Sequence, residues 1–246
     1  MFRRGDSQVG ERVRLFLFDF DQTLSVIHVF KSLAGWPRQD GGIVPIPKPY
    51  ASSELGQVVR LDQLSREVFQ EEGGFLHVAF GGPERIEQVR ATLESLTSVG
   101  AELVICTKGF VGPVRLALDR LGWLQFFSQI YGHIGDTYGA TPFDKQVAEE
   151  RSCPADLQSM LGERWQAQWT SKDALAQNLM RQKGLSADQV ILVEDDPQEI
   201  RKAKAVCRTL LVKEARGLTP GQLELLHRFS RGEAPPTGCS TGCWIL

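Results

Sequence analysis

Short, uninterrupted apolar runs alternate along this chain with longer segments of helical pattern, and this alternation constrains the fold more than any other feature. The apolar runs predict strands at residues 13–20, 102–107, 129–132, 189–194 and 208–212. Strands without polar alternation are typical of parallel sheets, which are buried on both faces. Helical segments at 83–99, 111–121, 171–183 and 197–205 supply the crossover connections that parallel strands need. The sequence therefore predicts an α/β fold with a doubly wound parallel sheet.

Two segments interrupt this alternation and are interpreted as insertions. Residues 25–82 follow the first strand, begin with a Gly- and Pro-rich run and continue into a helical segment at 54–69. Residues 135–170 carry Trp165 and Trp169 four positions apart, and we expect this pair to pack along one face of a helix.

The same pattern divides the 246 residues into three parts. We expect a core of residues 12–24 and 83–227, a small insertion at residues 25–82, and a flexible tail at residues 228–246. The tail is rich in Gly, Pro, Ser and Thr, which is typical of chain ends that lie outside a fold.

Charge and apolar content narrow the class of protein. The 28 basic and 30 acidic residues give a net charge of −2, so composition offers no support for nucleic-acid binding. No apolar stretch approaches the roughly 18–20 residues of a transmembrane helix, because Asp19 and Asp21 interrupt the best run. The basic N-terminus lacks the apolar region of a signal peptide. Five cysteines without a Cys-x-x-Cys pair fit a reducing compartment, so we expect a cytoplasmic protein.

The most informative segment is LFLFDFDQTLS at residues 15–25, where an apolar strand leads into Asp19 and Asp21. Ligands of open α/β sheets bind beyond the carboxyl ends of the strands, so both carboxylates are expected at the edge of a site. A single Asp at a strand end commonly caps a turn. Two acids at positions i and i+2 of an extended strand share a face, and two like charges held close need a cation or a shared proton.

A second acidic cluster, EDDPQE at residues 194–199, follows the apolar run VILV. Asp195, Asp196 and Glu199 come just past a predicted strand, where carboxylate oxygens suit a hard cation such as Mg²⁺. Acidic residues also favour the first turn of a helix, which is the alternative for this cluster taken alone. With the first acid pair at an equivalent strand end, we expect a shared Mg²⁺ site.

Two further residues stand where a phosphate-handling site needs hydrogen-bond donors. Thr107 ends the run ELVICT, and its hydroxyl is suited to a phosphoryl oxygen. Lys172 stands near the start of the helix that leads into the acidic strand, and its ammonium would neutralise an acyl phosphate and the clustered carboxylates. Lys145 is the rival candidate, in a less fitting position. A Thr at a strand end and a surface Lys are both common. The prediction of a phosphate-handling site therefore depends on the order of Thr107 and Lys172 relative to the two acid clusters.

In type and order, DFDQTLS, Thr107, Lys172 and VILVEDDPQE resemble the four motifs of the haloacid dehalogenase-like (HAD) hydrolase superfamily. The resemblance covers the core but neither the insertions nor the tail, and its first motif, Asp-x-Asp-x-Thr after an apolar strand, is the most specific. It implies a Rossmann-like HAD core with a small cap after the first strand. Glu194 and Asp196 stand where many members have Gly and a small residue, which leaves open which carboxylate binds the metal.

The resemblance also implies the chemistry of a Mg²⁺-dependent phosphohydrolase. Asp19 would be the nucleophile that forms an aspartyl-phosphate, and Asp21 would protonate the leaving oxygen and then activate water. Thr107 and Lys172 would stabilise charge on the transferring phosphoryl group. The metal would be held by residues of both acid clusters, namely Asp19, the backbone carbonyl of Asp21, Asp195 and Asp196. Relatives that cleave carbon–halogen bonds or stop at the phosphoenzyme typically alter the second Asp, so Asp21 favours a phosphatase.

Three alternatives remain beside a small-molecule phosphatase. A small cap leaves the site open to a phosphoprotein, and DFDQTL also resembles the DxDxT motif of phosphoprotein phosphatases that act on the polymerase tail. A catalytically silent HAD-fold protein would keep the metal site for binding or regulation. In a phospho-acceptor receiver domain the Lys follows all the acids, whereas Lys172 precedes the second acid cluster, so the order of residues argues against that domain.

The last four residues, Cys-Trp-Ile-Leu at 243–246, match the C-a-a-X pattern, and the terminal Leu indicates a geranylgeranyl group on Cys243. A chance match near a chain end is the alternative. One lipid chain gives only marginal anchoring, so acylation of Cys239 or the basic Arg228 and Arg231 would supply the second signal. On this hypothesis the cytoplasmic protein associates peripherally with a membrane.

Overall fold

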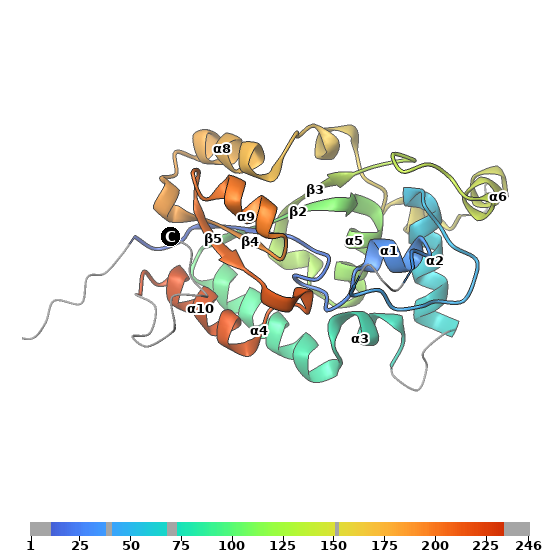
Figure 1. The fold of residues 1–246 in the computed structure, drawn as a ribbon, viewed down its shortest axis with the longest axis horizontal. Coiled ribbons are helices and arrows are strands. Elements are labelled where there is room, and N and C mark those ends of the chain that lie inside the picture. The colour runs from blue at the N-terminus through green and yellow to red at the C-terminus, as the bar shows by residue number, and fades with distance from the viewer. Residues whose placement is uncertain (1–10, 38–40, 68–72, 151–152, 234–246) are drawn as a thin grey trace, which may run out of the picture.

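The computed structural model describes residues 11–37, 41–67, 73–150 and 153–233, and these contain one parallel sheet with the strand order β3–β2–β1–β4–β5. The strands are β1 Leu15–Phe18, β2 Glu102–Phe110, β3 Phe127–His133, β4 Val190–Glu194 and β5 Arg208–Leu211. All neighbouring pairs are parallel. The predicted doubly wound α/β fold is confirmed (Figure 1).

Helices cover both faces of the sheet (Figure 1). One face is covered by α4 Pro83–Ser98, α5 Val111–Arg120 and α10 Pro220–Ser230, and the other by α8 Lys172–Lys183 and α9 Pro197–Ala203. Along β1, Phe16 and Phe18 pack into the first layer, while Leu15 and Leu17 pack into the second. Because side chains alternate along a strand, a strand buried on both faces has an uninterrupted apolar sequence.

The order of the strands reverses next to β1. From β1 the chain proceeds outward to β2 and β3, then returns to the other side of β1 to form β4 and β5. In open α/β sheets, ligands bind beyond the carboxyl ends of the strands at such a switch point. The segments that follow β1 and β4 therefore meet where a site is expected.

The described residues of the insertion after β1 form three helices, where the sequence predicted one. They are α1 Val29–Leu33, α2 Glu54–Glu67 and α3 Phe75–Phe80. In Figure 1, α1 and α2 lie at one end of the sheet, beside α6 Pro142–Glu150 of the second insertion. The buried Asp144 of α6 joins the two insertions, because its carboxylate accepts hydrogen bonds from the Ser52 N–H at 2.9 Å and the Ser53 hydroxyl at 2.9 Å.

The prediction that Trp165 and Trp169 lie on one face of a helix is wrong. The structure has a single 3₁₀ turn, Arg164–Ala167, so the two rings do not share a helical face. Trp165 is 42% exposed and packs edge-on against Tyr131, while Trp169 packs against His133. Both rings therefore pack against side chains of β3 and not along one face of a helix.

The structured part of the chain extends beyond the expected start of the tail. Helix α10 continues to Ser230, so residues 228–230 are helical. Phe229 is buried, and its carbonyl accepts the N–H of Val13 at 2.9 Å, ahead of β1. The cysteines of the lipidation hypothesis, Cys239 and Cys243, lie outside the described residues.

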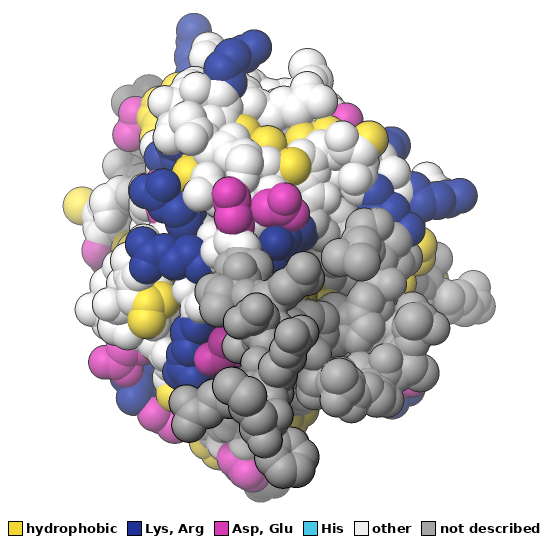
Figure 2. Space-filling view, turned by 90° about the vertical axis from the view of Figure 1, so that its left-hand side faces the viewer, with side chains coloured by type: hydrophobic (Ala, Val, Ile, Leu, Met, Phe, Trp, Pro, Cys, Tyr) yellow, Lys and Arg dark blue, Asp and Glu magenta, His cyan; other side chains and the backbone are white. Residues whose placement is uncertain are grey.

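The surface shown in Figure 2 carries basic and acidic side chains side by side among the described residues, with scattered hydrophobic ones. This mixture agrees with the near-balanced charge of the sequence. Within the described ranges, no helix combines the length and the apolar character needed to cross a membrane.

Candidate active site

Strand alternation brings Asp19 and Glu194 to the same face of the sheet. Leu17 on β1 pairs with Leu192 on β4, and both pack toward α8. Two positions further along each strand, Asp19 and Glu194 continue on that face. The Asp19 N–H donates to the Val193 carbonyl at 2.9 Å, which holds the two strand ends together. Glu194, one of the two residues at which the sequence departs from the HAD motif, therefore lies next to Asp19.

Lys172 is buried between these two carboxylates. It begins α8, which Ser171 caps with its side chain. The Lys172 Nζ donates to Asp19 Oδ1 at 2.5 Å and to a Glu194 oxygen. Burial favours the neutral amine, but Asp19 and Glu194 outweigh it and hold the pKa of Lys172 well above its usual value. The rival candidate, Lys145, is exposed on α6.

Asp195 completes a cluster of three acids. One ligand oxygen each from Asp19, Glu194 and Asp195 lie within 4.8 Å of one another. Burial, followed by the charge of Asp19, raises the pKa of Glu194 to about 8 and that of Asp195 to about 6. Burial also raises the pKa of Asp19, against the opposing effect of Lys172. Three carboxylates facing one ammonium have surplus negative charge, and their oxygens suit a divalent cation such as Mg²⁺.

Asp21 is oriented by the start of the first insertion. Its Oδ1 accepts the N–H groups of Val29 at 2.6 Å and Phe30 at 3.3 Å, and its Oδ2 lies 3.3 Å from the His28 Nδ1. Burial disfavours the charged imidazole, but the nearby Asp21 carboxylate outweighs it and raises the pKa of His28. Gln22, with a φ of 62°, takes the left-handed conformation that turns the chain away from the sheet.

Thr107 reaches the site from the neighbouring strand β2. The side chain is buried, and its Oγ accepts the N–H of Gly109 at 3.0 Å, so the hydroxyl hydrogen can be donated to a ligand. A Cβ at Gly109 would lie 3.3 Å from the Thr107 Oγ and 3.5 Å from the Asp21 Oδ2. The glycine therefore keeps the space between these two side chains open.

Two acids expected at the metal have other partners. Asp196 caps α9, its Oδ1 accepting the Gln198 N–H at 2.8 Å, and it lies outside the three-acid cluster. The buried Glu199 pairs with Lys108 at 3.1 Å and Lys202 at 2.9 Å. Burial works to raise the pKa of Glu199, but the two lysines outweigh it and lower that pKa. Helix capping and lysine pairing thus account for these two carboxylates.

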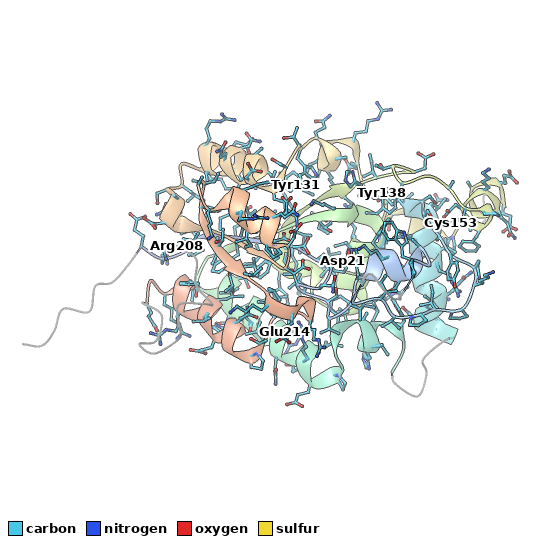
Figure 3. All side chains as sticks on the ribbon, viewed as in Figure 1. Asp21, Tyr131, Tyr138, Cys153, Arg208 and Glu214 are labelled. Atoms are coloured by element: carbon cyan, nitrogen blue, oxygen red, sulfur yellow. The ribbon has the colours of Figure 1, made fainter. Side chains whose placement is uncertain are left out.

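A pocket of about 580 Å³ brings together six of the predicted site residues, namely Asp19, Asp21, Thr107, Lys172, Asp195 and Asp196, but not Glu199. Four aromatic side chains that the sequence analysis did not identify also line it: His28, Phe30, Trp36 and Tyr138. Figure 3 shows Asp21 and Tyr138 at the same end of the sheet. Both insertions therefore contribute walls to the site that the strand ends form.

No protein-family model and no curated protein matches this sequence. Among solved structures, the chain is similar to a haloacid dehalogenase-like family hydrolase from Streptococcus pneumoniae, with 16% identity over 88% of this chain and 98% of that chain and a TM-score of 0.43. It is also similar to a predicted phosphoglycolate phosphatase from Haemophilus somnus (18% identity, 87% and 92% covered, TM-score 0.44) and to phosphoserine phosphatase in its apo form (14%, 81% and 86%, TM-score 0.41). Similarities this low do not establish an activity for this chain.

The raised pKa of Glu194 predicts how the stability of the fold depends on pH. The pKa of Glu194 is raised from 4.5 to about 8, so across this window the folded chain keeps a proton that the unfolded chain has lost. The free energy of unfolding of the metal-free protein should therefore fall as pH rises from about 4.5 to about 8. Mg²⁺ binds the deprotonated carboxylates, so it should raise the melting temperature more at a pH above 8 than near the Asp195 pKa of about 6.

Thermal unfolding with Mg²⁺ or with a chelator, at both pH values, measures this difference. An Asp195→Asn variant should lose most of the Mg²⁺-dependent shift, because one of the three clustered carboxylates is removed. Equal melting temperatures with Mg²⁺ and chelator above pH 8 would contradict a metal site in this cluster.

Proposed function

We propose that this chain is a HAD-like, Mg²⁺-dependent phosphatase that hydrolyses phosphate monoesters through an aspartyl-phosphate on Asp19. One observation carries the proposal: Asp19 is buried at the switch point of the sheet, in contact with Lys172 and clustered with two further carboxylates. Asp21 stands two residues away in the same pocket. A nucleophile, a proton donor and a charge-neutralising ammonium are thus gathered in one place.

In the first step, an Asp19 oxygen attacks phosphorus as the bond to the leaving oxygen breaks. Lys172 fixes the orientation of the attacking carboxylate through the 2.5 Å hydrogen bond to Oδ1. Asp21 transfers its proton to the leaving oxygen, so the alcohol departs neutral. Thr107 donates its hydroxyl hydrogen to a phosphoryl oxygen and, with Lys172, offsets the charge that develops there.

In the second step, water attacks the phosphorus of the aspartyl-phosphate. Asp21, now a carboxylate, takes a proton from this water, so inorganic phosphate is released and both acids return to their starting states. The Val29 and Phe30 N–H groups hold the Asp21 Oδ1 in place through both steps.

The metal fits the donor set of this site. Asp19 and Asp195, with the backbone carbonyl of Asp21, would hold Mg²⁺, and Glu194 adds a further carboxylate already paired with Lys172. When bound, Mg²⁺ would reduce the repulsion between the Asp19 carboxylate and the anionic phosphate.

Hydrolysis of a panel of small phosphate monoesters and phosphopeptides, with Mg²⁺ or with a chelator, tests the proposal. The pocket volume is in the range of small-ligand sites, so we expect Mg²⁺-dependent phosphate release from small esters. Activity confined to phosphopeptides would favour the DxDxT-type phosphoprotein phosphatase. Binding of Mg²⁺ without turnover of any substrate would favour the silent regulatory protein.

We also propose a cytoplasmic location, on the basis of the cysteine usage, and peripheral membrane association through a prenylated Cys243, on the basis of the C-a-a-X pattern. The intact mass of the chain purified from a eukaryotic host tests this proposal. A geranylgeranyl increment that is lost in Cys243→Ser supports it, and an unmodified mass rejects it.

A further inference from the structure

The geometry points to phosphate monoesters whose alcohol carries a flat aromatic ring as the substrates of this pocket. This inference rests on the proposed phosphatase function and names the substrate class of the same site. Asp21 gives its proton to the leaving oxygen, so the group attached to that oxygen occupies the space beside Asp21. Phe30 is one of the residues that line the pocket next to Asp21, and its backbone nitrogen lies 3.3 Å from the Asp21 Oδ1.

Phe30 and Tyr138 form an aromatic wall of the pocket, and both rings pack against the buried Phe110. The Phe30 ring centroid is 4.7 Å from that of Tyr138 and 5.7 Å from that of Phe110, and Tyr138 and Phe110 are 5.4 Å apart. The Tyr138 hydroxyl donates to the Lys108 carbonyl at 2.5 Å, which fixes the orientation of its ring. The wall is therefore held in place before any ligand binds, which reduces the entropy lost on binding.

Two rings that line the pocket are left open to solvent. Tyr138 is 45% exposed and Trp36 is 47% exposed, although most large apolar side chains in the described structure are buried. A flat ring entering the pocket can contact such rings by stacking or at their edges, which adds to the energy of apolar burial.

Binding of two phosphonates, measured by calorimetry with Mg²⁺, tests the inference without requiring turnover. Benzylphosphonate and cyclohexylmethylphosphonate share the anionic head and the ring size, and only the first has a flat π face. We expect the parent to bind benzylphosphonate roughly threefold to tenfold more tightly, the factor expected from one or two aromatic contacts. Tyr138→Leu and Trp36→Leu should each reduce this ratio, while Tyr138→Phe should keep it.

Trp165→Leu is the matched control, because Trp165 is a tryptophan of similar exposure, 42% against 47% for Trp36, that does not line the pocket. Its binding ratio should equal that of the parent. Equal affinity of the parent for both phosphonates, or a preference unchanged in both leucine variants, would overturn the inference. Hydrolysis of benzyl phosphate separates the two proposals: aromatic preference without hydrolysis rejects the phosphatase alone, and hydrolysis without preference rejects the aromatic substrate class alone.

Discussion

Asp19→Asn should lower kcat/KM for phosphate monoesters by roughly three orders of magnitude or more, the scale seen when a catalytic nucleophile is removed. An amide is a poor nucleophile and cannot form the acyl phosphate. The fold should survive, because Asn has nearly the same shape and removes one charge from a cluster with surplus negative charge. Steady-state kinetics with Mg²⁺ and thermal unfolding measure the two effects separately.

Asp119→Asn is the matched control for this prediction. Asp119 is exposed near the C-terminal end of α5, outside the pocket, so its loss should leave kcat/KM within about twofold of the parent. If Asp19→Asn hydrolyses the same esters as fast as the parent, Asp19 is not the nucleophile.

Glu54→Leu should lower the free energy of unfolding by about 1–3 kcal/mol, because the buried Gly112 amide is left without an acceptor, and an unpaired buried amide costs about that much. Glu54 is buried at the start of α2, and its carboxylate accepts three backbone N–H groups, those of Gly112, Gly135 and Gly162, each at 2.8 Å. These glycines belong to α5 and to the second insertion. One carboxylate thus ties both insertions to the core.

Urea denaturation of the parent, Glu54→Leu and Glu54→Gln measures this effect. Glu54→Gln should be destabilised less than Glu54→Leu, because one side-chain oxygen still accepts hydrogen bonds. Glu149→Gln, an exposed acid on α6, should match the parent. A change of less than about 0.5 kcal/mol in Glu54→Leu would show that these hydrogen bonds contribute little.

The sheet and the first acids were accessible from sequence because both depend on local patterns. Buried parallel strands give continuous apolar runs, and Asp19 and Asp21 follow such a run directly. The end of β2 was harder to place, since the strand continues to Phe110, three residues beyond the predicted end at Thr107.

The position of Glu194 in the site follows from the alternation of side chains along β4. Glu194 has the same parity on β4 as Leu192, which packs toward α8, and Asp19 has the same parity on β1 as Leu17. Two acids at equal parity on paired strands face the same helix, and Lys172 begins that helix. Counting strand parity would have placed Glu194 beside Lys172.

The walls of the pocket had no comparable local signal. Tyr138 meets Phe30 across more than one hundred positions of sequence, through insertions with no repeating pattern. The partners of Glu54 are backbone amides of glycines, which no side-chain pattern reveals. Contacts of this kind depend on tertiary packing, so sequence periodicity does not predict them.

The most direct test of the account is the detection of a phosphoryl group on Asp19. The parent is mixed with benzyl phosphate and Mg²⁺, quenched in acid during turnover, digested and analysed by peptide mass, with Asp19→Asn as the control. We predict the mass of one phosphoryl group on the peptide that contains Asp19, and no such increment in the variant. Phosphate release without a phosphorylated peptide, or a phosphoryl group on another residue, would contradict the account.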